Sequence, residues 1–92
     1  MNAEKAELIA INALTWILQN PTYLSSFIGI TGATTSDFQE NATEIPFLGS
    51  ILDFVLSSDE YTLEFCNSHN FDQQSIFIAR QFLPGSNLPN WT

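Results

Sequence analysis

Residues 45–60 read IPFLGSILDFVLSSDE, and this stretch decides the fold class. At 100° per residue, its first twelve residues place the large apolar side chains on an arc of about 200°. Ser57-Ser58-Asp59-Glu60 then matches a capping box, which starts a further helix. A surface helix needs an apolar stripe little wider than ~100°. We therefore predict that helix 45–56 is either central in a bundle or shared with another chain.

Helical signals continue on both sides of this stretch. The first helix is expected over 3–19, and its apolar side chains span an arc of about 220°. These side chains are Ala6, Ile9, Ala10, Ile11, Ala13, Leu14, Trp16, Ile17 and Leu18. The other helices are expected over 21–30, about 36–42, 59–68 and from 72 to just before Pro84. A capping residue is expected at the start of each.

No run shows sustained alternation of apolar and polar residues, so strands are not expected. The sequence predicts an all-α fold, a compact single-domain bundle of roughly five to six short helices. The first and fourth helices are expected at its centre. The helical domain is expected over 1–85, with a C-terminal tail over 86–92.

Composition and charge exclude several function classes. The 92 residues are 45% hydrophobic and include one cysteine, so a core is expected but a disulfide framework is not. Ten acidic residues against two basic ones give a net charge of -8, which leaves no basic footprint for nucleic acid. An anionic membrane surface is disfavoured for the same reason. No basic leader precedes the apolar stretch from Leu8 to Leu18, so we expect a cytoplasmic protein without a membrane span.

Several short motifs follow one another up to Gly85. They are Ala13-Leu14 with Trp16-Ile17-Leu18, Pro21-x-x-Leu24-x-x-Phe27 running into Thr31-Gly32, Phe47-Leu48 with Leu52-Asp53, and Arg80 with Leu83-Pro84-Gly85. In this order they resemble a small alphaproteobacterial family of unknown function, which is all-helical and of about this length. The sequence departs from that pattern at Phe77, where small residues are usual, and at Asn70, where glycine would close the helix. The resemblance implies a helical fold and a bacterial, cytoplasmic setting, and it implies no activity.

Two pairs of chemically capable side chains occur on the fifth helix. Cys66 and His69 have the spacing of two metal ligands, but a structural zinc needs four. No oxyanion motif accompanies them, so a buried thiol and a histidine at the core edge are expected instead. Glu60 and Glu64 share a solvated face, and an exposed pair of carboxylates is not arranged for acid–base catalysis. We expect no catalytic residue, no metal and no cofactor, and hence no enzyme.

Asp53 and Arg80 are the candidate structural pair. Arg80 is the only arginine, and Asp53 is the only charged residue of helix 45–56. We predict that they meet across the fourth and sixth helices and fix the register of their packing. The alternative is an exposed Arg80 that contacts a partner.

Phe77, Arg80 and Trp91 are the candidate partner contacts. Phe77 lies on the sixth helix away from Ile76, Ile78, Ala79, Phe82 and Leu83, where it would either anchor another protein or pack under Leu88 or Trp91. Trp91 either packs back onto the helical domain or contacts a partner. The sequence thus favours a non-catalytic protein-interaction module or accessory subunit, with self-association left open. The alternative is an acidic mimic of nucleic acid that binds a basic protein groove.

Overall fold

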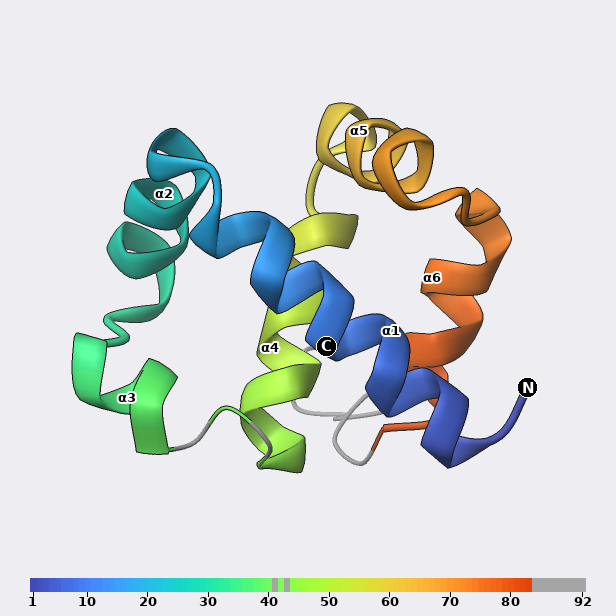
Figure 1. The fold of residues 1–92 in the computed structure, drawn as a ribbon, viewed down its shortest axis with the longest axis horizontal. Helices are drawn as coiled ribbons and strands as arrows, with labels where there is room; N and C mark the ends of the chain where they lie inside the picture. The colour runs from blue at the N-terminus through green and yellow to red at the C-terminus, as the bar shows by residue number, and fades with distance from the viewer. Residues whose placement is uncertain (41, 43, 84–92) are drawn as a thin grey trace, which may run out of the picture.

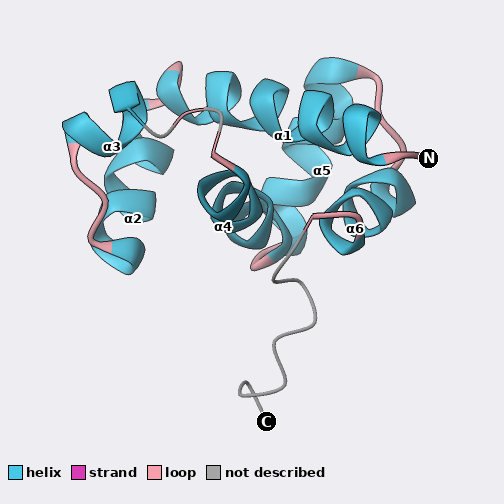
Figure 2. Cartoon of the chain, turned by 90° about the horizontal axis from the view of Figure 1, so that it is seen from below, coloured by secondary structure: helices cyan, strands magenta, loops and turns pink. Residues whose placement is uncertain are grey.

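The computed structural model describes residues 1–40, 42 and 44–83, and within them the chain forms six helices and no strand (Figures 1 and 2). The helices are α1 (Ala3–Leu18), α2 (Pro21–Thr31), α3 (Thr35–Glu40), α4 (Ile45–Leu56), α5 (Asp59–His69) and α6 (Gln73–Gln81). The predicted all-α class is confirmed. The expected boundary at residue 85 and the tail over 86–92 lie outside the described residues.

Helices α1 and α4, predicted as the central pair, make the most extensive contact between any two helices of the described structure. α1 packs against α2, α4 and α6, whereas α4 packs against α1, α5 and α6. In Figure 1, α1 crosses in front of α4, with α2 and α3 on one side and α5 and α6 on the other. Seen along the perpendicular direction, α1 lies along one side of the molecule and α4 lies near its middle (Figure 2).

The wide apolar arc of α4 is covered within the chain. Leu48, Ile51, Leu52 and Val55 have no exposed surface, and Phe54 is 4% exposed. Aromatic rings close the α2 side of this core. Phe27 packs edge-on against Phe38, Phe47 and Phe54, with ring centroids 5.5–6.0 Å apart. Of the two explanations for the arc, central position is therefore sufficient, and α4 needs no second chain to cover it.

The helix ends follow the local sequence signals, except that two expected capping residues, Asn20 of α2 and Asp72 of α6, make no side-chain capping bond. Thr34 and Asp37 form a reciprocal cap for α3, and the Ser58 hydroxyl accepts from the Tyr61 N–H at the start of α5. Asn20 lies at the N-cap position of α2, but its side chain makes no capping bond. Its amide instead donates to the Trp16 carbonyl at 2.6 Å, because the short α1–α2 connection brings that unpaired carbonyl within reach.

Candidate functional site

The guanidinium of Arg80 joins α6 to α4. Its Nε donates to Oδ1 of Asp53 at 2.6 Å and its Nη2 donates to Oδ2 at 3.1 Å, which is bidentate geometry. Its Nη1 donates to the Leu83 carbonyl at 3.3 Å, just beyond the end of α6. The Arg80 side chain is 10% exposed, whereas that of Asp53 is 48% exposed. The structure thus brings the candidate pair together as a partly desolvated ion pair.

Gly49 makes room for this ion pair on α4. A Cβ at Gly49 would lie 3.2 Å from both Cζ and Nη1 of Arg80. The guanidinium therefore rests directly against the backbone of α4. Three guanidinium nitrogens of Arg80 donate within the chain, and this geometry supports a role in positioning α6. The use of Arg80 as a partner contact stays a prediction.

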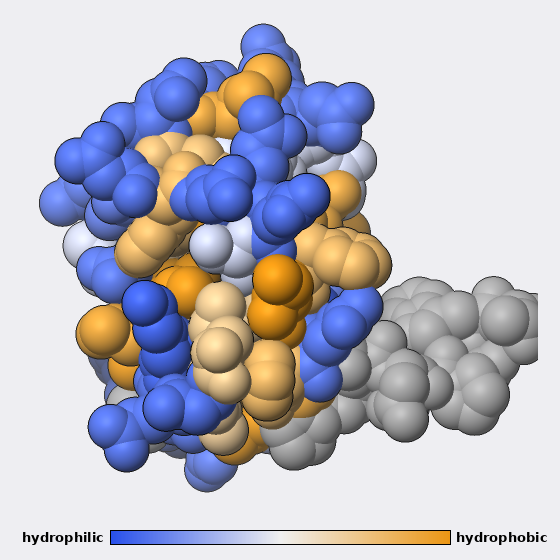
Figure 3. All heavy atoms as spheres, turned by 90° about the vertical axis from the view of Figure 1, so that its right-hand side faces the viewer, coloured by the Kyte–Doolittle hydropathy of each residue, from blue (hydrophilic) through white to orange (hydrophobic). Residues whose placement is uncertain are grey.

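The outward face of α6 is apolar and uncharged. Phe77 is 58% exposed, and it is accompanied by Phe82 at 44% and Ile78 at 39%. The other exposed side chains of this helix are the glutamines Gln73, Gln74 and Gln81. On the side of the molecule that carries α6, hydrophobic side chains gather in the middle of the surface, with hydrophilic ones above and below (Figure 3).

Ile78 and Phe82 correct the sequence interpretation, which placed them with the core residues of α6. The buried stripe of α6 is narrower than expected and consists of Ile76, Ala79, Arg80 and Leu83. Ile78 and Phe82 are one turn apart, and the narrow stripe leaves both facing outward. Their hydrophobicity was visible in the sequence, but their exposure depends on how α6 packs against α1, α4 and α5.

Trp91, the third candidate contact, lies outside the described residues. So does Leu88, and with them the alternative that Phe77 packs under the C-terminal segment. Among the described residues, Phe77 has the exposure expected of a surface anchor. Its use as a contact stays a prediction.

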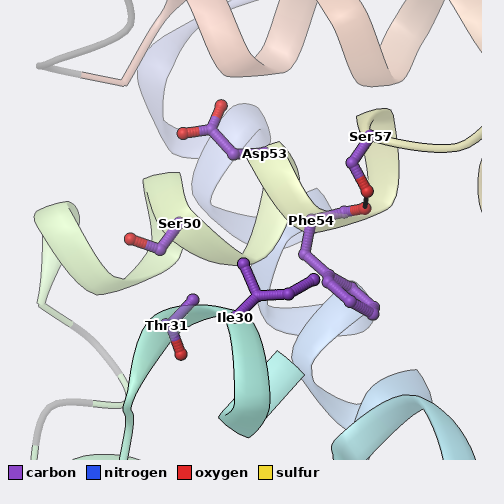
Figure 4. A pocket seen from close by; sticks show the side chains of 6 residues that line it. All are labelled: Ile30, Thr31, Ser50, Asp53, Phe54 and Ser57. Atoms are coloured by element: carbon purple, nitrogen blue, oxygen red, sulfur yellow. Dashed lines mark hydrogen bonds between the residues drawn. The ribbon is translucent and has the colours of Figure 1, made fainter. Parts of the chain in front are cut away.

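A shallow groove separates the end of α2 from α4, and no sequence motif indicated it. Its volume is about 290 Å³, and it is lined by Ile30, Thr31, Ser50, Asp53, Phe54 and Ser57. Ile30 and Phe54 form its apolar floor, while the carboxylate of Asp53 points away from them (Figure 4).

The hydroxyls that line this groove are bonded to their own helices. Ser57 donates to the Phe54 carbonyl at 2.6 Å, Ser50 to Pro46 at 3.2 Å, and Thr31 to Phe27 at 2.7 Å. The lining residues therefore present no hydroxyl paired with a general base, which is what nucleophilic catalysis requires.

Cys66 and His69 lie at the edge of the core near the end of α5. Cys66 is 4% exposed, and its burial, together with the negative charge of Asp72, raises the pKa of the thiol. The His69 ring packs against Phe65 and Phe71, and its buried Nδ1 has no hydrogen-bond partner among the described residues. The described residues contain no group of three or more histidine, cysteine or acidic side chains arranged to hold a metal.

Glu64 has a specific role that its spacing from Glu60 did not indicate. The Tyr23 hydroxyl on α2 donates to both carboxylate oxygens of Glu64 on α5, at 2.5 and 2.6 Å. Bonding to this carboxylate, followed by desolvation and the nearby negative charge, raises the pKa of Tyr23 to about 12. The pair therefore connects α2 and α5 in addition to the ring contact between Tyr23 and Tyr61, whose centroids are 4.9 Å apart.

Comparisons with known proteins identify the family but add no activity. No curated protein and no solved structure matches the chain. None of the helices in the described ranges is long and apolar enough to cross a membrane. The model of a family described as "Protein of unknown function (DUF3572)" matches residues 3–86. The chain therefore belongs to this family of unknown function.

Proposed function

We propose that this protein is a non-catalytic interaction module that binds another protein through the outward face of α6. One observation carries the proposal: Phe77, Ile78 and Phe82 are exposed together on an uncharged helix face of a chain with a net charge of -8. Exposed aromatic side chains are a common source of binding energy at protein interfaces, which are depleted of charge at their centres.

The ion pair behind α6 supports this use of the helix. Arg80 fixes the helix against α4, so the three apolar side chains are held on a rigid support before a partner arrives. A preorganised surface loses less conformational entropy on binding than a mobile one. The bacterial cytoplasmic setting expected from the sequence belongs to the same proposal.

The alternative, an acidic mimic of nucleic acid, requires one continuous acidic surface. The acidic side chains are instead distributed over the starts of α1, α4 and α5, over α3, over the N-cap position of α6 and, as Glu64, over the middle of α5. Asp53 is also neutralised by Arg80. This distribution favours the helix dipoles and not a groove-filling acidic face.

Affinity capture with matched variants tests the proposal. The bait is the full chain, compared with Phe77→Ser and with Ile30→Ser, a control at a more exposed apolar position on α2 (72%). We expect a partner that is captured by the wild type and by Ile30→Ser and is reduced at least ~tenfold by Phe77→Ser, as for an interface hot spot. The proposal is wrong if Phe77→Ser retains every protein that the wild type captures, while both have the same melting temperature.

A further inference from the structure

We propose that residues 84–92 of this chain bind in the groove between α2 and α4. The Trp91 ring then covers Ile30 and Phe54, which form the apolar floor of the groove (Figure 4). Residues 84–92 lie outside the described residues, whereas the groove and the chain that leads to it are described. The inference does not depend on the function proposed for α6, because it uses a different surface.

The last described residues direct the chain from α6 towards α4. The Leu83 side chain is 1% exposed, and its carbonyl accepts from Nη1 of Arg80 at 3.3 Å. Nε and Nη2 of the same guanidinium donate to Asp53, which lines the groove. Figure 2 shows α4 between α2 and α6, with the described chain after α6 turning towards α4. The described chain therefore ends one guanidinium away from a residue of the groove.

The length of the segment suffices for this path. An extended chain advances about 3.3–3.6 Å per residue, so Leu88 can reach about 17 Å from Leu83 and Trp91 about 27 Å. The segment has to cross α4 alone, and a helix with its side chains is about 10–12 Å wide. Both large apolar residues of the segment can therefore reach the groove.

The composition of the segment matches that of the groove. Residues 84–92 read PGSNLPNWT and contain no charged side chain, although the chain carries a net charge of -8. Binding in the groove removes the apolar surface of Leu88 and Trp91 from water. The three hydroxyls that line the groove are already bonded to their own helices. An uncharged, apolar segment can therefore bind without leaving a hydroxyl of the groove unpaired.

Two prolines favour an extended path across α4. Pro84 and Pro89 have φ fixed at about −65°, and each biases the residue before it towards extended backbone. Restricting the backbone in this way reduces the conformational entropy that the segment loses when it binds. The sequence of the segment thus favours the conformation that the path requires.

The covalent connection distinguishes this occupant from a separate molecule. A segment tethered by a few residues is present at an effective concentration in the millimolar range. One tryptophan in a groove of about 290 Å³ is a small contact, which is populated at that concentration but would not hold a free partner. A second copy would also bring another charge of -8 close to the first, whereas binding within one chain does not.

The outward face of α6 is the competing position for Trp91. Phe77 and Leu83 lie on different sides of α6, because Phe77 is 58% exposed and Leu83 is 1% exposed. A segment that leaves Leu83 towards α4 would have to reverse its direction around α6 to reach Phe77. The groove lies ahead of the segment, and it can cover an aromatic ring on more than one side.

The fluorescence of Trp91 in the full chain tests the inference. The sequence contains two tryptophans, so Trp16→Phe leaves Trp91 as the only one. We expect acrylamide to quench Trp91 about threefold less in the folded chain than in urea, as for a segment that is bound about two thirds of the time. If Trp16→Phe does not fold, the difference between the emission of the wild type and of Trp91→Phe isolates the same residue.

Two variants with the same added charge locate the contact. Ile30→Asp should raise the quenching constant of Trp91 about threefold, because a charge on the apolar floor releases the segment. The variant should still fold, since Ile30 is 72% exposed. Phe77→Asp is the matched control at an exposed apolar position of α6, and it should leave the quenching of Trp91 unchanged.

Three results would overturn the inference. The first is equal quenching of Trp91 in the folded and the unfolded chain. The second is protection of Trp91 that survives Ile30→Asp, or that is lost in Phe77→Asp because the ring packs on α6. The third is protection that is lost on dilution from about 100 μM to about 1 μM, because binding within one chain does not depend on protein concentration.

Discussion

Arg80 shows how one buried charge can determine the placement of a helix. Its three donor nitrogens are used by Asp53 and by the Leu83 carbonyl, and its plane rests against Gly49. Such a pair stabilises little relative to an apolar core, but removing one partner leaves a buried charge unpaired. The contribution of this arrangement is therefore mainly to the position of α6 and of its outward face.

Asp53→Ala should lower the free energy of unfolding by about 2 kcal/mol, because it leaves the buried guanidinium without its carboxylate. Urea unfolding measures the change. Adding Arg80→Met to Asp53→Ala should recover most of the loss, since no buried charge then remains. A loss below about 0.5 kcal/mol for Asp53→Ala, typical of surface substitutions, would contradict this role.

Two helical glycines provide a matched test of the packing against Arg80. Gly29→Ala should stabilise the protein by roughly 0.5–1 kcal/mol, because alanine is the better helix former and its Cβ meets nothing within 4 Å. Gly49→Ala should destabilise it, because its Cβ approaches the guanidinium to 3.2 Å. Thermal unfolding of both variants checks the difference in sign. Equal stabilisation by both would show that the guanidinium moves away freely.

The Tyr23 hydroxyl should ionise at a higher pH than an ordinary tyrosine. Its neutral form is favoured in the folded state, so the stability contributed by its bond to Glu64 is fully present below pH 10 and is lost as the pH rises towards 12. In a Tyr61→Phe background, absorbance at 295 nm follows Tyr23 alone. Glu64→Gln should move its titration midpoint from about 12 towards 10, because it removes the carboxylate to which the hydroxyl donates and, with it, the charge that opposes ionisation. An unchanged midpoint would exclude Glu64 as the cause.

At the scale of elements, the helix ends follow from short-range rules. Gly32 ends α2 at φ 74°, and Asn70 ends α5 at φ 57°. Both angles lie in the left-handed region, where glycine has no steric penalty and asparagine a small one. Asn70 can therefore end α5 without a glycine at this position, because it adopts the required backbone conformation.

Asn70→Gly should therefore stabilise the protein by roughly 0.5 kcal/mol, and Gly32→Ala should destabilise it by roughly 1–2 kcal/mol. A Cβ at Gly32 meets nothing within 4 Å, so its loss would come from the backbone alone. The midpoint temperatures of both variants measure these effects. If Gly32→Ala left the midpoint temperature unchanged, the end of α2 would have to rearrange without any loss of stability.

At the scale of the whole molecule, the charge of -8 opposes both compaction and association. Raising the salt concentration from about 10 mM to about 200 mM shortens the Debye length from about 30 Å to below 10 Å. The melting temperature at low micromolar protein should therefore rise by about 2–4 °C. A melting temperature independent of salt would indicate that the acidic side chains are already locally compensated.

The sequence alone determined the helical class, the extents of the helices and the partners Asp53 and Arg80. Periodicity and caps act over a few residues, and a single arginine leaves few choices for an ion pair. Which apolar side chains stay exposed was decided only by tertiary structure: α4 is enclosed, while Leu8 and Leu18 of α1 and Ile78 and Phe82 at α6 face outward. The groove between α2 and α4 has the same origin. Exposure depends on which helices pack on which face, and that is a property of contacts between segments far apart in the chain.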